Sequence, residues 1–314
     1  MYFPYLRGRQ FELIAIRELI EKHKLSAKVI PIIEPVKLSS TLSKTISAAQ
    51  ANNQKLSVIM NPQVGSLLAD AKKDKTGQKL FNLHKQIIES DSVIKTIIAA
   101  KDSAETLYAL NSSGIKSEDI MTIYIDRDYV DIYESVFEGK SLYNVVPYDS
   151  SFRRVRGERI MVADRFADIK KERNNDYAER TDVFFSDDHL YYAEDNYVGF
   201  SDFSVVGQDY QETGFAPYAV AIHIVYMDEK TNDFRVRHFV SDSNDDINDP
   251  ANKFYEAVSK LVEWNSKMKL STFGMQEFER LYNEGAYPGL GVVKKLSIMH
   301  HLEIVGNYLE DENK

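Results

Sequence analysis

Short apolar runs rich in β-branched residues alternate with helix-like segments along the first two thirds of the sequence, and this alternation constrains the fold most strongly. The first run, residues 2–6, precedes QFELIAIRELIEKH, in which apolar residues recur at helical spacing. The later runs are KVIPIIEPV, LSVIMNP, VIKTIIAA, IMTIYID, LYNVVPY, RIMVAD and YVGFSDF. Strands that alternate with helices indicate a parallel sheet with right-handed crossovers. Eight such units in roughly 200 residues predict an α/β fold of the (β/α)8 TIM-barrel type.

An open, doubly wound parallel sheet is the structural alternative. Such a sheet is expected to carry a glycine-rich phosphate-binding turn after its first strand, and YLRGRQFE is not such a turn. No Walker-type loop occurs elsewhere in the sequence. The pattern therefore favours a closed barrel over residues 1–205.

The sequence pattern changes after residue 205. PYAVAIHIVYM and FRVRHFVSD flank the turn-forming stretch DEKTND and predict a β-hairpin. The segments that follow, KFYEAVSKLVEWNSKM, MQEFERLYNEG and GLGVVKKLSIMHHLEIVGNYL, have helical periodicity. Because no linker rich in Pro, Gly or Ser precedes them, we expect residues 206–314 to form a β-hairpin and helices packed on the barrel rather than an independent domain.

Composition excludes several classes of protein. The sequence has no cysteine, which rules out disulfides, a thiol nucleophile and a thiolate metal site, and favours the reducing cytoplasm. It shows no pattern of a secretory signal, and no apolar run has the length of a membrane span. The formal net charge of −9 disfavours general nucleic-acid binding, because phosphate backbones repel a uniformly acidic protein.

Polar residues stand where the predicted strands end, and in TIM barrels the carboxyl ends of the strands form the active face. In chain order these positions hold Arg7, Glu34, Asn61, Lys101, Asp126, Tyr148, Asp164 and Asp202. The candidate catalytic residues are Glu34, Asp126 and Asp202. The candidate ligand-binding residues are Arg7, Asn61, Lys101 and Asp164.

Two chemical uses of these residues are open. Several carboxylates that converge on one point favour a cation such as Mg²⁺ or Mn²⁺, and this metal, with Arg7 or Lys101 holding an anion, would suit phosphoester hydrolysis. Alternatively, one protonated and one ionised carboxyl group could carry out acid–base catalysis. A purely structural role competes with both, because Asp and Asn commonly cap helices or form turns at such positions, and Asp164 could do only that.

Two further groups of residues carry weaker signals. The basic segment SFRRVRGER is either a solvated turn or a binding site for phosphate or an acidic partner. His223 and His238 lie on the two predicted hairpin strands and could pair across them. His300 and His301 are adjacent on a predicted helix, so they point to different sides and cannot form an i, i+4 zinc pair.

The N-terminal sequence MYFPYLRGRQFELIAIREL, followed by VIPIIEP, resembles the beta-protein family, which is named for a phage protein and includes many bacterial relatives. GFSDF is similar to the family's later Gly-x-x-Asp strand. The resemblance covers roughly the first forty residues and implies that Arg7, Glu34 and Asp202 are site residues. Members of the family are often found beside mobile elements and phage-defence genes, and the resemblance implies no particular reaction.

Two hypotheses follow. In the first, the chain is a cytoplasmic phage-defence or mobile-element-associated protein whose barrel rim binds an anionic, phosphate-bearing ligand, with metal-assisted phosphoester hydrolysis as one form of that function. In the second, it is a non-catalytic sensor or scaffold that binds a partner protein, such as a nuclease or another defence component. Convergence of Glu34, Asp126 and Asp202 on one open pocket would favour the first, and dispersed acids that cap helices would favour the second.

Overall fold

The structure is a computed structural model that describes residues 1–73, 77–167, 169–171, 173–212 and 217–311. Its residues group into two compact units. The first, called the barrel unit, comprises Met1–Leu13, Ala27–Asp164 and Asp188–Phe203. The second unit comprises Ile14–Ser26, Arg165–Asp187 and the chain from Ser204 onward. It thus takes in two segments that precede residue 205, in addition to the hairpin and helices expected after it.

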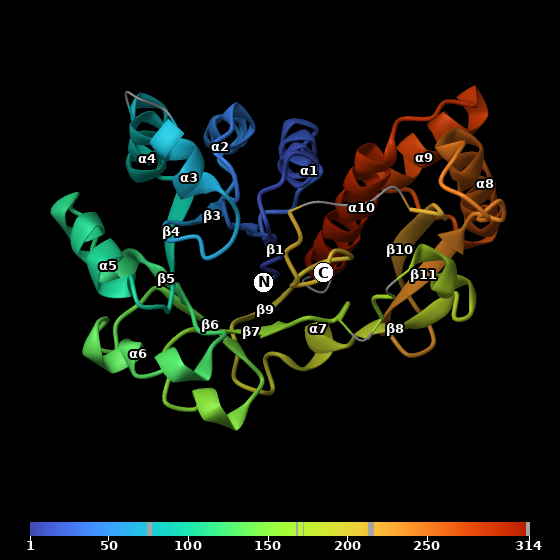
Figure 1. Ribbon diagram of the computed structural model, residues 1–314. Helices are drawn as coiled ribbons and strands as arrows, with labels where there is room; N and C mark the ends of the chain where they lie inside the picture. Colours follow the sequence, from blue (N-terminus) through green and yellow to red (C-terminus); the bar gives the residue numbers. More distant parts are fainter. Residues whose placement is uncertain (74–76, 168, 172, 213–216, 312–314) are drawn as a thin grey trace. The chain divides into compact units, whose positions relative to one another are not determined.

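Eight parallel strands with helices between them form a nearly closed barrel, and the predicted (β/α)8 TIM-barrel-like fold is confirmed (Figure 1). The strands are β1 (Tyr5–Leu6), β2 (Ile32–Ile33), β3 (Leu56–Ile59), β4 (Val93–Ile98), β5 (Met121–Ile123), β6 (Tyr143–Pro147), β7 (Arg159–Ala163) and β9 (Gly199–Asp202). They neighbour one another in chain order, and every pairing is parallel.

The first and last strands of the barrel meet at the N-terminal residues. Tyr2 forms parallel bridges with both Val29 and Phe200. The Phe3 N–H donates to the Phe200 carbonyl at 2.8 Å, and the Phe200 N–H donates to the Met1 carbonyl at 3.1 Å. A Cβ atom at Gly199 would lie 2.7 Å from the Met1 carbonyl oxygen, so this close approach requires glycine.

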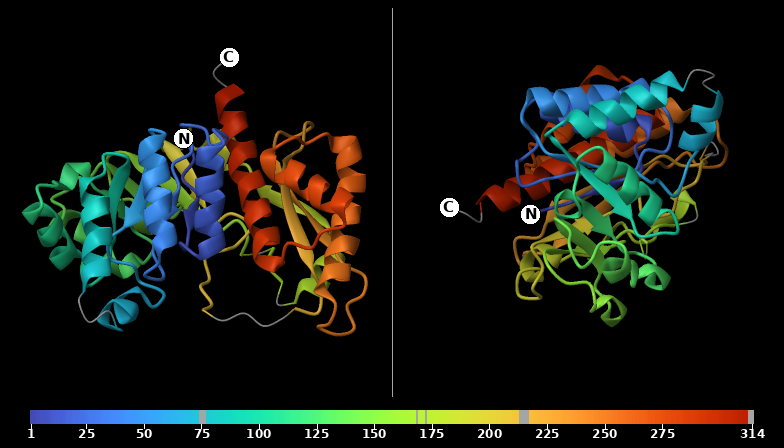
Figure 2. Two further views of the ribbon diagram at one scale, coloured as in Figure 1. Left: turned by 90° about the horizontal axis from the view of Figure 1, so that it is seen from above. Right: turned by 90° about the vertical axis from the view of Figure 1, so that its left-hand side faces the viewer.

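Helices and short helical turns connect the strands. The α-helices are α1 (Gln10–Glu21), α2 (Ser40–Ala51), α3 (Leu67–Lys73), α4 (Gln78–Glu89), α5 (Ser103–Ser112), α6 (Ile132–Ser135) and α7 (Asp188–Tyr191). The 3₁₀ turns are η1 (Ser117–Asp119), η2 (Arg127–Tyr129) and η3 (Ser150–Phe152). Figure 2 shows α2 and α4 running beside each other outside the sheet, where the Gln86 side chain donates to the Ser43 carbonyl at 2.9 Å. The link between β6 and β7 is short and contains η3 in place of an α-helix.

One apolar cluster fills the barrel interior. It includes Phe3, Tyr5, Ile123, Val162 and Phe203, all of which are buried. Side chains along a strand alternate between its two faces, so residues at even spacing from these share the interior side. This alternation decides which strand-end residues face the interior.

The second unit contains a three-stranded antiparallel sheet in the order β10-β11-β8. β10 (Ala221–Met227) and β11 (Phe234–Val240) form the predicted hairpin, and β8 (Asp182–Ser186), which was not predicted, pairs with the other edge of β11. The remaining elements are the turn η4 (Asn174–Ala178) and the helices α8 (Pro250–Met268), α9 (Phe273–Glu284) and α10 (Leu290–Asp311). Figure 1 shows α10 and α8 on opposite sides of this sheet.

Side-chain contacts attach both helices to the sheet. Trp264 of α8 packs against Tyr226 and Phe239, with ring centroids 5.3 and 5.4 Å apart. His300 of α10 lies 2.5 Å from the Val225 carbonyl through Nε2, and its Nδ1 lies 2.7 Å from the Thr272 hydroxyl. Among the described helices, none combines the length and apolar character needed to cross a membrane.

The second unit contains several buried histidines whose pKa is lowered, so its stability should depend on pH. Burial lowers the pKa of His238 and His300 to about 4 and that of His301 to about 3. These groups are neutral in the folded protein but protonate near pH 6.5 when unfolded, so acid favours the unfolded state. We therefore expect the free energy of unfolding to fall as the pH drops from 6.5 to 4.5, by about 3 kcal/mol for a group such as His300 once both of its pKa values are passed.

Urea unfolding followed by the fluorescence of Trp264, the single tryptophan, measures this effect. Carboxyl groups with a lowered pKa, such as Glu256 at about 2, lose most of their stabilisation below pH 4.5 and affect the result little. His300→Gln should flatten the pH dependence, because it removes one of the buried imidazoles. A stability that is constant between pH 6.5 and 4.5 would contradict the expectation.

Candidate functional site

Arg7 and Glu34 meet on the interior side of the barrel rim. Arg7 lies two residues after Tyr5, and Glu34 lies two residues after Ile32, and both Tyr5 and Ile32 belong to the interior cluster. The Arg7 guanidinium forms an ion pair with Glu34 Oε2, which also accepts a hydrogen bond from the Tyr5 hydroxyl at 2.7 Å. Burial, followed by the charge of Glu34, raises the pKa of Tyr5, so its hydroxyl remains a donor.

The other oxygen of Glu34 binds the backbone. Oε1 accepts the N–H of Gln63 at 2.7 Å and the N–H of Val64 at 3.2 Å, and the side chain has no exposed surface. Glu34 therefore joins the ends of β1 and β2 to the loop after β3. These contacts engage both oxygens and suit a structural anchor better than a proton-transfer group.

The backbone conformation after Arg7 requires a glycine, Gly8. Its φ is +59°, a conformation that favours glycine, and a Cβ atom there would lie 2.8 Å from the Glu34 carbonyl oxygen. The chain can thus turn directly over Glu34 into α1. The Arg-Gly dipeptide that opens the sequence is in this way part of the Glu34 anchor.

Asn61 extends the pairing of β3 and β4 beyond their regular ends. Its amide nitrogen donates to the Ile98 carbonyl at 2.8 Å and to Asp102 Oδ1 at 2.9 Å, and its oxygen accepts the Ile98 N–H at 2.8 Å. The Gln63 side chain donates to the Asn61 carbonyl at 2.7 Å. Glu34, Gln63, Asn61 and Asp102 thus form one connected polar network at the rim, and Lys101 is exposed next to it.

Asp126 and Asp202 do not join this network. Asp202 immediately precedes the interior residue Phe203, so it faces the other side of the sheet, where it accepts the Tyr2 hydroxyl at 2.8 Å. Asp126 is exposed and accepts the N–H of Asp128 at 2.9 Å, which caps η2. Asp164 lies at interior register, two residues after Val162, and is partly buried.

The three candidate catalytic acids therefore lie in three different settings: an interior anchor, a solvent-exposed cap and a buried position on the outer face. Among the described residues, no group of three His, Asp or Glu side chains is placed to hold a metal ion. Carboxylates arranged in this way do not assemble the oxygen-rich site that Mg²⁺ or Mn²⁺ requires. The acids are dispersed, but only Asp126 caps a helical turn.

A pocket of about 320 Å³ lies instead between the loops that follow β5 and β6. It is lined by Arg127, Val130, Asp131, Ser150, Ser151, Arg153 and Arg154, and we call it the arginine pocket. Arg127 Nη2 donates to the Ser151 hydroxyl at 3.2 Å, and Arg154 pairs with Asp131 at 3.0 Å. The sequence indicated the basic segment SFRRVRGER, but Arg127 was missed because its place beside that segment depends on the neighbouring strands.

Charges in the arginine pocket are unbalanced. Three guanidinium groups line it and only one carboxylate, Asp131, does so. The nearby Asp149 is used otherwise: its Oδ1 accepts the N–H of Ser151 at 2.6 Å and caps η3. Hydrogen bonds from Ser151 lower the pKa of Asp149, so it is ionised at neutral pH. The surplus of positive charge suits an anionic ligand.

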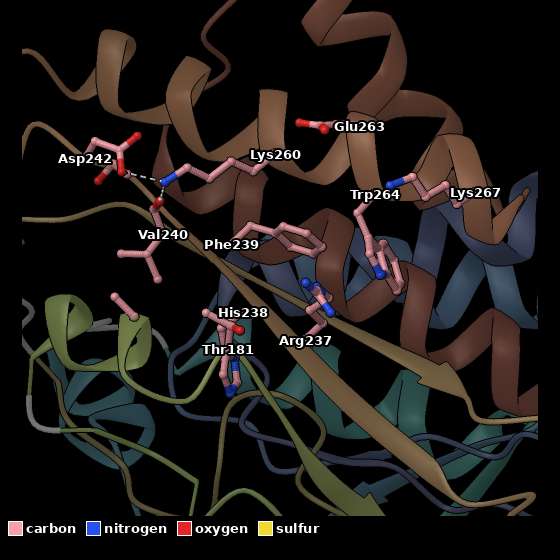
Figure 3. Close-up of a pocket in the computed structure, with 12 residues that line it drawn as sticks. Thr181, Arg237, His238, Phe239, Val240, Asp242, Lys260, Glu263, Trp264 and Lys267 are labelled. Carbon is pink, nitrogen blue, oxygen red and sulfur yellow. Dashed lines mark hydrogen bonds and ion pairs between the residues drawn. The ribbon is translucent and has the colours of Figure 1, made fainter. Parts of the chain in front are cut away.

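The second unit contains a pocket of about 450 Å³ between α8 and β11 (Figure 3). Two of the three cations that line it, Lys260 and Arg237, already have carboxylate partners. Lys260 donates to the Val240 carbonyl at 2.7 Å and to Asp242 at 2.6 Å, and Arg237 pairs with Asp182 at 3.1 Å while lying 5.7 Å from the Trp264 ring centre. The register of β8 with β11 ends at Arg237. Lys260 donates to a carbonyl group of β11 beyond that point, so this lysine has a structural role at the strand edge.

The fold and rim define a TIM-barrel-like protein with an arginine-lined pocket at the carboxyl ends of two strands. In comparisons with known proteins, no protein-family model, no curated protein and no solved structure matches the chain. The resemblance to the beta-protein family therefore stays a prediction from the N-terminal motifs.

The roles of the rim acids can be separated by their effects on stability. We expect Glu34→Gln to destabilise the protein by about 3 kcal/mol, because it leaves the Arg7 guanidinium buried without a counter-charge. Asp126→Asn should change stability by less than about 0.5 kcal/mol, because Asn caps a helical turn as well as Asp does. Urea unfolding followed by far-ultraviolet circular dichroism compares the two variants.

A double variant tests the cause of the Glu34 effect. Arg7→Met with Glu34→Leu removes both charges and should recover much of the stability lost in Glu34→Gln. Equal stabilities of Glu34→Gln and Asp126→Asn would show that Glu34 is not an anchor.

Proposed function

We propose that the chain is a non-catalytic sensor whose barrel rim binds an anionic, phosphate-bearing ligand in the arginine pocket. One observation carries this proposal: Arg127, Arg153 and Arg154, from the loops after two successive strands, line the same pocket with a single lining carboxylate. Guanidinium groups present paired N–H donors that match phosphate oxygens, which makes arginine the residue suited to this recognition.

The position and size of the pocket support the same function. It lies at the carboxyl ends of β5 and β6, on the face where TIM barrels bind their ligands. The hydroxyl groups of Ser150 and Ser151 add hydrogen-bond donors for an oxyanion. A volume of about 320 Å³ falls at the small end of ligand pockets, which favours a small phosphorylated molecule over a polymer.

Metal-assisted phosphoester hydrolysis has less support than binding. Glu34 is engaged by Arg7, Tyr5 and two backbone N–H groups, which leaves it poorly placed to coordinate a cation or move a proton. Asp126 caps η2, and Asp202 faces away from the interior. These assignments favour the sensor over the hydrolase.

The biological setting belongs to the same proposal. The resemblance of the N-terminus to the beta-protein family supports a cytoplasmic role in phage defence or beside mobile elements. A sensor in that setting would pass ligand binding to a partner, such as a nuclease or another defence component. The net charge of −9 supports a partner with a basic surface.

Removal of the arginines tests the ligand site. We expect Arg153→Ala with Arg154→Ala to weaken binding of inorganic phosphate at least about tenfold, because each guanidinium group supplies charge-assisted hydrogen bonds. The backbone amide signals of Ser150 and Ser151, followed by nuclear magnetic resonance during a phosphate titration, report binding at this pocket.

Arg156→Ala is the matched control, because Arg156 is exposed in the same segment but does not line the pocket. Its phosphate affinity should stay within about twofold of the unsubstituted protein, as expected for a screened surface charge. An equal loss in Arg156→Ala, or no saturable change at Ser150 and Ser151 in the unsubstituted protein, would overturn the proposal.

A further inference from the structure

A second pocket in the second unit gathers lysines around a histidine pair. The pocket has a volume of about 340 Å³, and we call it the lysine–histidine pocket. β10 contributes His223, and the segment before η4 contributes Lys170 and Lys171. Asn174 and Tyr177 of η4, and Leu290, Val293, Lys294 and Ser297 from the first turns of α10, also line it.

The histidine pair is held in a fixed geometry. His223 and His238 are opposite each other in the β10–β11 register, and their Nδ1 atoms are 2.8 Å apart. The ring of Tyr177 lies 4.6 Å from His223 and 4.7 Å from His238, measured between centroids. In a neutral pair, one Nδ1 donates and the other accepts, and the accepting imidazole carries its proton on Nε2. If His223 is the acceptor, its Nε2–H is a donor available to a ligand.

The surroundings of this pair are mainly cationic. Lys170, Lys171 and Lys294 line the pocket. Asp209 pairs with Lys170 at 3.6 Å, and the charge of Asp182 acts on His238. The first turns of α10, a helix of 22 residues, add the partial positive charge of a helix N-terminus.

The placement of three lysines beside the histidine pair suits an anion in the pocket. Burial lowers the pKa of His223 well below its usual value, and the charges of His238 and Lys294 lower it further. Burial also lowers the pKa of His238 to about 4, and Lys171 adds to this effect. A histidine pair with a purely structural role needs no lysines around it. An anion among these groups would offset the charges of the lysines and favour protonation of the pair.

We propose that the lysine–histidine pocket binds a small dianionic oxyanion, such as a phosphomonoester, with Lys171 and Lys294 as its cationic contacts, and that binding is coupled to proton uptake by the His223–His238 pair. The volume limits the ligand to a small molecule. This site lies in the second unit and does not depend on the function proposed for the barrel rim.

Sulfate is the probe of choice, because it stays dianionic where phosphate itself titrates. The test uses the full chain carrying Arg153→Ala and Arg154→Ala, so that binding in the arginine pocket is weakened. The protein is labelled with ¹⁵N in its seven histidines, and the ring signals of His223 and His238 are followed during a sulfate titration at constant ionic strength. We expect saturable shifts of both signals and an affinity at least about threefold tighter at pH 6 than at pH 7.5, because proton uptake accompanies binding.

Lysine variants test the contacts. Lys171→Gln with Lys294→Gln should weaken sulfate binding at least about tenfold. Lys230→Gln removes one charge of the same sign from the exposed hairpin turn of the same unit and should leave the affinity within about twofold. Urea unfolding followed by Trp264 fluorescence establishes that each variant is folded before its affinity is compared.

Three results would overturn the inference. The first is the absence of saturable shifts at His223 and His238 up to about 50 mM sulfate, well above a millimolar dissociation constant. The second is undiminished binding in a folded Lys171→Gln, Lys294→Gln variant. The third is an affinity that does not change between pH 6 and 7.5, which would remove the coupling to the histidine pair. None of these results bears on the arginine pocket, because the readouts are the ring signals of His223 and His238 and two of the three arginines of that pocket are removed.

Discussion

Closure of the parallel sheet is the constraint on which the rest of the barrel unit depends. An open parallel sheet leaves unpaired N–H and C=O groups along two edges, and the hydrogen bonds of Phe3 and Phe200 join those edges. Gly199 permits this junction because a larger residue would collide with the Met1 carbonyl. Once the ring is closed, the carboxyl ends of all eight strands lie on one rim. The rim then holds two kinds of polar group: buried ones that fasten neighbouring strands and exposed ones on the loops.

Both units bury ionisable groups, but the barrel unit pairs a buried charge with an opposite charge, whereas the second unit keeps its buried histidines neutral. In the barrel unit, Glu34 stays in contact with Arg7 and accepts hydrogen bonds at both oxygens, which offsets the cost of removing the pair from water. In the second unit, burial keeps His300 and His301 neutral. Positively charged side chains are concentrated in the arginine pocket and the lysine–histidine pocket. These are the places where the chain has charge to offer a ligand.

The sequence allowed the architecture to be predicted better than the site. Continuous β-branched runs made the eight barrel strands recognisable, and the alternating hairpin placed His223 opposite His238. β8 was missed because its partner, β11, is distant in sequence and no local pattern indicates their pairing. Predicting which rim acids face the barrel interior required the exact phase of each strand. A change of one residue in strand phase moves a side chain to the other face, and Asp202 lies one residue before the interior position Phe203. The meeting of Arg127 with Arg153 and Arg154 likewise required the three-dimensional arrangement of two loops.

The discontinuous second unit has a consequence for biosynthesis. Glu18 on α1 pairs with Lys295 on α10 at 2.7 Å, and 277 positions separate them along the chain. During translation Glu18 emerges from the ribosome long before Lys295 has been made. The segment Ile14–Ser26, which belongs to the second unit, therefore cannot complete its contacts until α10 has been synthesised. A chaperone that protects this segment would have to stay bound until then, because Ser26 also contacts Glu310 near the end of α10.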